Sequence, residues 1–166
     1  MFFRIMLICS IIFSCTNSFA QNQESNIIIV DDFSNVSRDC FSNGRAWYTF
    51  GGLSLTCERG VISVKGQNLS VFAGFGIAPG ANGENGMPII TNGKKNFVVE
   101  VEGTASALKV ELYDSDQKQH AVWIGTGTNP QHRELPPKFE TSTIAKMQFL
   151  TSPGNVDLKL KKIYFE

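Results

Sequence analysis

The chain has 166 residues, of which 42% are hydrophobic, and its 15 basic and 15 acidic side chains give a formal net charge of zero. No run or stripe of Lys and Arg stands out, so nucleic acids and anionic lipid surfaces are poor candidates for its partners. This length is enough for one domain with a real hydrophobic core.

Residues 1–20, MFFRIMLICSIIFSCTNSFA, have the layout of a secretory signal peptide. Arg4 precedes a short apolar run, and small residues stand at the positions before the cut that a signal peptidase reads. A transmembrane helix would need about 20 consecutive apolar residues. We therefore expect cleavage after Ala20, a secreted or periplasmic protein and one mature domain over residues 21–166. The alternative is a lipoprotein that is anchored through Cys15.

Four cysteines are present, and two of them, Cys9 and Cys15, would leave with the signal peptide. Cys40 and Cys57 would then remain as an even pair in a compartment that permits disulfides. No second Cys or His stands at metal-ligand spacing from either of them. The sequence thus predicts a disulfide worth about 3 kcal/mol in the chain-entropy model, with two buried free thiols as the alternative.

Along the rest of the chain, short apolar or alternating segments are separated by turns rich in Gly, Pro, Asn and Asp. The predicted strands are 27–33, 46–50, 53–57, 60–66, 70–77, 96–103, 107–114, 120–125, 145–151 and 155–166. No stretch of about ten residues has a convincing helical period. This spacing predicts an all-β domain, an antiparallel β-sandwich of the jelly-roll type.

The closing segment NVDLKLKKIYFE changes the phase of its alternation partway along. Its apolar positions are Val156, Leu158, Leu160, Ile163 and Phe165. A bulge at Lys161 and Lys162 would explain the change, because one extra residue turns every later side chain to the opposite face. We expect this strand to lie beside the first strand and to close the sandwich.

Several of these segments together resemble the galactose-binding-like jelly rolls. They are VDDF, the W that follows it, NFVVEVEG leading into ALKVELYD, LPPKFE, IAKMQF and LKLKKIYF. The pattern is similar to the family 11 carbohydrate-binding modules and to the domain of complex I intermediate-associated protein 30. The resemblance spans Ile27 to Phe165. It implies a two-sheet sandwich that binds a polysaccharide on a concave face or in apical loops, often beside a structural calcium ion.

The implied calcium site needs several oxygen ligands with carboxylates among them. The carboxylates that could supply them are Asp31, Asp32, Asp157 and Glu166. Where family members place Asp or Asn in the closing strand, this chain has Lys161 and Lys162, whose ammonium groups would repel the ion. The alternative to a metal is an ion pair between one of these lysines and Asp31 or Asp32.

A sugar site needs an exposed aromatic ring beside polar side chains that can form hydrogen bonds. Lys109, Glu111 and Tyr113 alternate with apolar residues and therefore share one face of their strand. If strand 107–114 neighbours strand 96–103, Glu100 joins them on a shallow polar face. The predicted ligand-binding residues are Trp47, Tyr48, Glu100, Lys109, Glu111, Tyr113, His120 and Trp123.

Each of these positions also has a purely structural interpretation. Trp47 and Trp123 could be core aromatics, and Tyr113 could cover a sheet edge. The charged residues could form a solvated face with cross-strand ion pairs, each worth less than about 1 kcal/mol. In the functional interpretation, Trp47, Tyr48 and Arg133 would border the binding face from a loop edge.

The sequence has no catalytic signature. Glu100, Glu102 and Glu111 could supply the two carboxyl groups that a glycosidase needs, but carboxylates are common on exposed strands. The two histidines, His120 and His132, have no metal-ligand spacing, and there is no GxSxG motif. We therefore expect a protein that is not an enzyme and has no cofactor apart from the possible calcium ion.

Two functional hypotheses follow. The first is a secreted, non-catalytic carbohydrate-binding module whose partner is a polysaccharide or another glycan. The second is a protein-interaction or assembly module of the cell envelope that uses the same sandwich face. In a eukaryotic secretory route, Asn35 and Asn68 would also be glycosylation acceptors, since each begins an N-x-S sequence.

Overall fold

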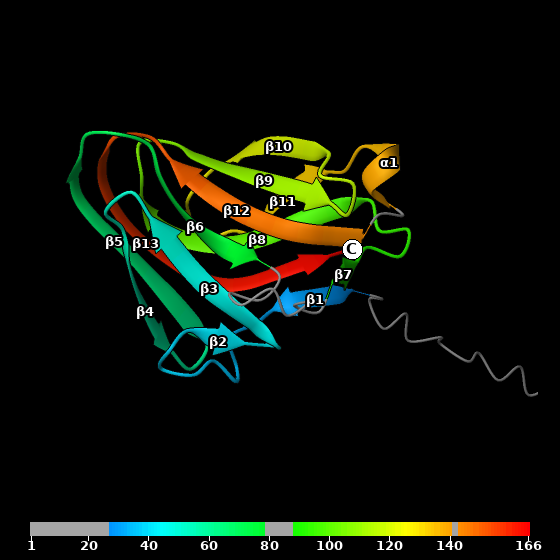
Figure 1. Cartoon of the computed structure of the whole chain (residues 1–166), viewed down its shortest axis with the longest axis horizontal. Coiled ribbons are helices and arrows are strands. Elements are labelled where there is room, and N and C mark those ends of the chain that lie inside the picture. The colour runs from blue at the N-terminus through cyan, green and yellow to red at the C-terminus, as the bar shows by residue number, and fades with distance from the viewer. Residues whose placement is uncertain (1–26, 79–87, 141–142) are drawn as a thin grey trace, which may run out of the picture.

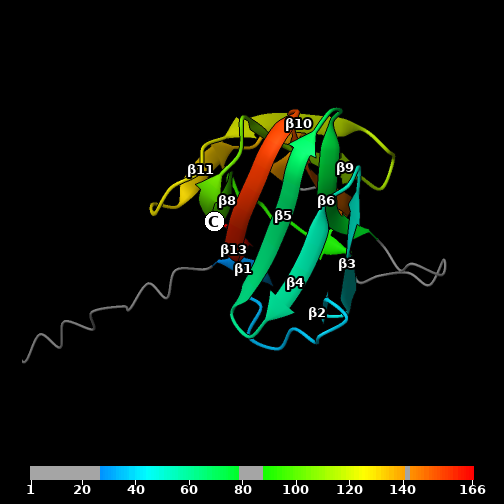
Figure 2. The same ribbon diagram turned by 90° about the vertical axis from the view of Figure 1, so that its left-hand side faces the viewer.

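The computed structural model describes residues 27–78, 88–140 and 143–166, which form two antiparallel β-sheets packed face to face. Figure 1 shows β9, β12, β6 and β3 side by side in one layer, and Figure 2 shows β13, β5 and β4 in the other. The predicted antiparallel jelly-roll sandwich is confirmed. The predicted signal peptide and Cys15 lie outside the described residues.

The two sheets contain every strand of the described residues. The first sheet has the order β11 (Gln131–Glu134), β8 (Asn96–Thr104), β13 (Gly154–Phe165), β5 (Val61–Leu69) and β4 (Ser54–Glu58), with β1 (Ile28–Asp31) paired to β13. The second sheet has the order β10 (Gln119–Ile124), β9 (Leu108–Asp114), β12 (Thr143–Thr151), β6 (Ala73–Ala78), β3 (Arg45–Phe50) and β2 (Phe41–Ser42), with β7 (Ile89–Ile90) paired to β12. A single helical turn, α1 (Pro137–Glu140), follows β11.

The core lies between the sheets because the apolar positions of each strand share one face. Phe75 of β6 and Phe149 of β12 stack with ring centroids 4.9 Å apart, and Phe97 lies 5.5 Å from Phe165 in the other sheet. The largest fully buried side chains are Phe33, Phe75, Phe97, Phe149, Phe165, Ile62, Leu108, Leu112, Ile144, Met147, Leu158 and Leu160. The alternation predicted for strand 107–114 is therefore confirmed.

The closing strand β13 behaves as its sequence predicts. Leu160 pairs with Val101 and Lys162 with Glu100, so the register shifts by one residue at Lys161. The apolar residues on both sides of this bulge are buried. Beyond it, β13 pairs antiparallel with β1, with Phe165 opposite Ile28. The predicted bulge and the predicted pairing of the first and last strands are both confirmed.

Cross-sheet links close both open edges of the sandwich. At one edge the predicted disulfide is present, and it joins Cys40, just before β2, to Cys57 of β4, with the two Cα atoms 5.3 Å apart. At the other edge β10 of the second sheet lies beside β11 of the first (Figure 2). Within the described part of the chain, no helix is long and apolar enough to cross a membrane.

The secondary-structure elements that the sequence pattern missed are short. β2, β7, β11 and α1 have between two and four residues each, and β11 falls in a segment that reads as a turn. The segment predicted as strand 70–77 begins its pairing only at Ala73. As a result, Val71 and Phe72 project from a loop and are 60% and 64% exposed.

Candidate functional site

The outer face of the second sheet, opposite the core, gathers polar and aromatic side chains from four strands. We call the side chains of Tyr48, Gln148, Glu111, Lys109, Tyr113, Phe50, Leu150 and Trp123 the outer face. One row of this face crosses the sheet from β3 to β9. Tyr48 of β3 pairs with Gly76 of β6, Gly76 pairs with Gln148 of β12, and Gln148 pairs with Glu111 of β9. A second row parallel to it runs from Phe50 through Gly74, Leu150 and Lys109 to Trp123 of β10.

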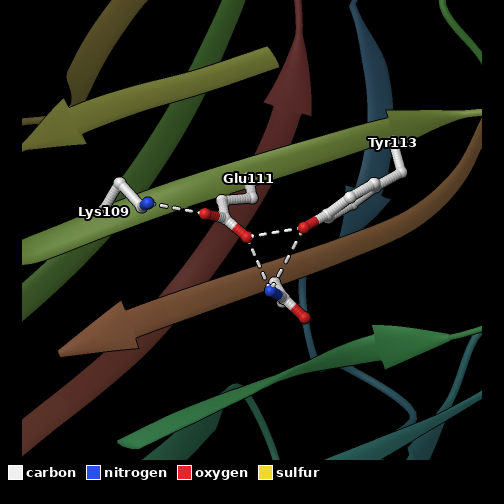
Figure 3. Close-up of polar contacts among 4 residues, drawn as sticks. Lys109, Glu111 and Tyr113 are labelled. Carbon is white, nitrogen blue, oxygen red and sulfur yellow. Dashed lines mark hydrogen bonds and ion pairs between the residues drawn. The ribbon is translucent and has the colours of Figure 1, made fainter. Parts of the chain in front are cut away.

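Glu111 is the centre of the polar part of this face. It is only 5% exposed, although it lies on the side of the sheet away from the core. Its Oε2 accepts hydrogen bonds from the Tyr113 hydroxyl at 2.7 Å and from Gln148 Nε2 at 2.6 Å. Its Oε1 pairs with Lys109 Nζ at 2.6 Å. Figure 3 shows Lys109 and Tyr113 reaching the Glu111 carboxylate from the same strand.

Two glycines of β6, Gly74 and Gly76, leave space on this face that lets the network extend to β3. Neighbouring strands are about 4.8 Å apart, so Tyr48 and Gln148 are separated by two such spacings. Gly76 lies between them, and the Tyr48 hydroxyl donates to Gln148 Oε1 at 3.3 Å across it. A Cβ atom on Gly76 would lie 2.3 Å from the carbonyl oxygen of Met147. Only glycine fits there, and the Gln148 amide is oriented from both ends.

The charge states of the cluster follow from these contacts. Burial of Glu111 raises its pKa, but the hydrogen bonds from Lys109, Tyr113 and Gln148 outweigh burial, and the net pKa is below the ordinary 4.5. Burial and the bond to Glu111 raise the pKa of Tyr113 to about 12. Near neutral pH, Glu111 is thus a carboxylate and Tyr113 a hydroxyl donor.

We predict that Glu111 makes stability depend on pH at the acid end. Because its pKa is lowered in the folded protein, ionised Glu111 stabilises the fold above the unfolded pKa, and this contribution is lost as the pH falls through the folded pKa. Between about pH 5 and pH 3, the free energy of unfolding should therefore fall less steeply for Glu111→Gln than for wild type. Urea unfolding at a series of pH values measures the slopes. Glu102→Gln removes a carboxylate from the other sheet as a control, and equal slopes for wild type and Glu111→Gln would contradict the prediction.

An apolar pocket adjoins the polar cluster at Lys109. The pocket has a volume of about 280 Å³ and is lined by Phe72, Lys109, Trp123, Leu150 and Ser152. Trp123 is 59% exposed, so its indole is available to a ligand. On the far side of the cluster, the rings of Tyr48 and Phe50 stack at 6.3 Å. The outer face therefore has aromatic rings on both sides of a fixed polar centre.

The structure brings five of the predicted binding residues together on the outer face. They are Tyr48, Lys109, Glu111, Tyr113 and Trp123. The Tyr113 ring, however, is covered by the Lys146 ammonium, 4.9 Å from its centroid. Tyr113 is therefore a hydrogen-bond donor to Glu111 here, and Trp123 is the exposed ring.

Three predicted residues lie elsewhere. Trp47 is in the core, 5% exposed, and its Nε1 donates to Asp31 Oδ2 at 3.1 Å. Glu100 is on the outside of the first sheet, because β8 and β9 belong to different sheets and are not neighbours. His120 pairs with Leu112 and turns toward the inner side, where its ring lies 5.4 Å from that of Phe139.

The carboxylates that were expected to bind calcium do not lie together in one cluster. Asp31 pairs with Ile163 of β13, whereas Asp157 lies earlier on that strand and is 3.9 Å from Lys65. In the described ranges, no group of three or more His, Cys, Asp or Glu side chains is arranged to hold a metal ion. Metal analysis of the purified protein is the test of calcium binding.

The buried Asp31 carboxylate accepts hydrogen bonds from protein donors. Its Oδ1 accepts from the Phe33 backbone N–H at 2.9 Å and from Ser42 Oγ at 2.8 Å, in addition to the Trp47 bond at Oδ2. Neither lysine of the bulge is paired with it. Lys161 pairs with Glu102, and Lys162 lies over the Tyr164 ring at 4.9 Å.

Lys162 still has a small effect on the other aspartate of this pair. Hydrogen bonds from Ser34 hold the pKa of Asp32 below its ordinary value, and the charge of Lys162 adds a lesser lowering. The expected ion pair of Lys161 or Lys162 with Asp31 or Asp32 is therefore not formed. Lys162 acts on Asp32 only through a weak, long-range interaction between their charges.

Sequence reasoning missed Phe50, Gln148 and Leu150 of the outer face, and it missed Phe72, which lines the adjoining pocket. One signal was available in AGFGI, where Gly74 and Gly76 alternate with buried Ala73, Phe75 and Ile77. Such an alternation indicates a strand that has glycines, and so no side chains, at these positions of its outer side. The loop position of Phe72 had no sequence signal, because Ser70 to Ile77 reads as one continuous strand.

Comparison with known proteins supports the fold. No protein-family model matches the chain, and no curated protein matches it. Among solved structures, a point mutant of a family 29 carbohydrate-binding module has a TM-score of 0.53 at 17% identity, covering 83% of this chain and 88% of the module. Another mutant of such a module, complexed with cellulohexaose, has a TM-score of 0.53 at 15% identity, covering 83% and 87%.

A larger protein contains a similar domain. An agarase matches with a TM-score of 0.58 at 11% identity over 84% of this chain and 24% of the agarase chain. At these identities the likeness shows the fold alone. This chain has the β-sandwich fold of carbohydrate-binding modules.

Proposed function

We propose that this protein is a secreted, non-catalytic carbohydrate-binding module that binds a glycan on the outer face of its second sheet. The observation that carries the proposal is the exposed Trp123, with Phe72 beside it, next to the fixed cluster of Lys109, Glu111 and Gln148.

The two parts of the face match the two parts of a sugar. The C–H face of a sugar ring packs on an aromatic plane, which Trp123 and Phe72 offer. The sugar hydroxyls need hydrogen-bond partners, and the Lys109 ammonium, which the Glu111 carboxylate holds in place, supplies a donor. Because Glu111 and Gln148 are already held by neighbours, binding costs little side-chain ordering.

Further observations support the non-catalytic and exported parts of the proposal. Glu111 is ionised near neutral pH and so is not a general acid, and Glu100 and Glu102 are on the opposite sheet. The disulfide between Cys40 and Cys57 fits an oxidising compartment. The similar modules include one complexed with cellulohexaose and one complexed with mannohexaose. Membership of family 11 itself stays a prediction.

Affinity gel electrophoresis against a panel of soluble glucans, mannans and agarose tests the proposal. We expect at least one polysaccharide to retard the wild-type protein. Trp123→Ala should weaken that binding by roughly 30-fold or more, the effect of removing a central aromatic anchor. Since Trp123 is 59% exposed, the variant should keep its fold, which circular dichroism checks.

Tyr164→Ala is the matched control, because it removes an aromatic ring from the outside of the first sheet. It should leave the retardation unchanged. Equal retardation of wild type and Trp123→Ala would contradict the proposed site. No retardation by any polysaccharide, with recovery of a specific partner protein in a pull-down, would favour the envelope assembly module instead.

A further inference from the structure

The exposed Trp123 lies on β10, which is the edge strand of the second sheet and, among the described strands, pairs with β9 alone. An edge strand has a row of backbone groups without ladder partners and frays more readily than a central strand. If the indole of Trp123 is to stack on a ligand in a fixed position, other contacts must hold β10 in place.

Two side chains of β11, in the other sheet, bond to the backbone of β10 and of the residue that follows it. Arg133 Nε donates to the carbonyl oxygen of Trp123 at 2.7 Å, while its Nη1 donates to the carbonyl oxygen of His132 at 2.6 Å. Gln131 Oε1 accepts from the backbone N–H of Gly125 at 3.3 Å. We call Gln131 and Arg133 the latch.

The alternation of β11 explains why these two residues reach across the sandwich edge. Gln131 is opposite Val99 and Arg133 is opposite Phe97, and both partners point into the core. The residue between them, His132, is opposite Val98 and turns outward, where its Nδ1 lies 2.9 Å from Glu166 Oε1. Adjacent residues of one strand thus have separate roles, which provides a control variant.

We propose that Arg133, assisted by Gln131, is the positioning residue for Trp123: it fixes the edge strand and so sets the height and angle of the indole above the pocket. The effect on glycan affinity rests on the proposed function, but the fixing of β10 does not. Arg133 acts through the backbone of Trp123 and touches no ligand. Its planar guanidinium bonds two carbonyl groups at once, a geometry that a lysine ammonium does not reproduce.

Hydrogen exchange of the ligand-free protein tests the latch directly. In Arg133→Ala, amide exchange of residues 119–124 should be about tenfold faster than in wild type, the factor for losing one hydrogen bond to a charged group. Residues 143–151 of the central strand β12 serve as the internal reference and should be unchanged. Arg133→Lys should show the same acceleration, and it stands in for Arg133→Ala if that variant does not fold.

A second readout follows Trp123 itself. In protein labelled with 5-fluorotryptophan, the ¹⁹F resonance of Trp123 is identified by its absence in Trp123→Phe. It should shift in both Arg133 variants, whereas the resonance of the buried Trp47 should not. Affinity for whichever panel polysaccharide binds wild type should fall about fivefold or more, as expected for a lost anchor geometry.

His132→Ala is the matched control, and it should leave the exchange of residues 119–124, the Trp123 resonance and the affinity as in wild type. Unchanged exchange and an unchanged Trp123 resonance in both Arg133 variants would overturn the inference. If no polysaccharide binds wild type, the proposed function fails, yet exchange and ¹⁹F signals still decide whether the latch positions Trp123.

Discussion

Replacing Asp31 with alanine is expected to lower the free energy of unfolding by at least about 3 kcal/mol. The carboxylate is fully buried, and its removal leaves the Phe33 N–H, the Ser42 hydroxyl and the Trp47 indole N–H without their acceptor. Each buried donor that is left without a hydrogen-bond acceptor lowers the free energy of unfolding by about 1–3 kcal/mol. Urea unfolding monitored by circular dichroism measures the difference.

The neighbouring Asp32 provides the control. It is partly exposed, and its Oδ1 accepts from the Ser34 backbone N–H at 3.0 Å. Asp32→Ala should therefore cost less than about 1 kcal/mol. A loss below about 1 kcal/mol for Asp31→Ala would show that this network is not what holds β1 and β3 together.

The double variant Cys40→Ser, Cys57→Ser is expected to lose about 3 kcal/mol of stability in the chain-entropy model. The bridge joins two cysteines with a sequence separation of 17 and links the two sheets at the edge formed by β2 and β4. Thermal unfolding with and without dithiothreitol measures the loss, and reduced wild type should match the double variant.

This variant also separates stability from binding. The disulfide lies at the opposite edge of the sandwich from β10, which carries Trp123. Below its melting temperature, the double variant should therefore bind the same polysaccharide as wild type. If reductant left the melting temperature of wild type unchanged, the bridge would contribute nothing to stability. If binding were lost in the folded double variant, the site would extend to this edge.

Predicting the face of a residue within one strand worked because alternation has a period of two residues. Lys109, Glu111 and Tyr113 share a face in the structure as their spacing requires. The bulge at Lys161 was predictable for the same reason, since only an extra residue reconciles the two phases of β13. Both inferences need only local geometry.

Predicting which strands are neighbours failed for Glu100, because strands adjacent in sequence need not lie in one sheet. β8 and β9 are joined by a short connection, yet the chain crosses from one sheet to the other there. Alternation fixes the face of each strand and carries no information on this crossing. The burial of Trp47 and the exposure of Trp123 were not predictable either. Each tryptophan is flanked by residues without a clear polar and apolar contrast, so alternation does not assign it to a face.

The sequence alone determined the all-β architecture, the disulfide and the face that carries Glu111, because strand periodicity, turn residues and cysteine count are local properties. Only the tertiary structure decided that Gly76 opens a path between Tyr48 and Gln148, that Trp123 is exposed while Trp47 is buried, and that Arg133 holds β10. These features depend on which strands lie next to each other across and between sheets, and that arrangement is set by packing of the whole core.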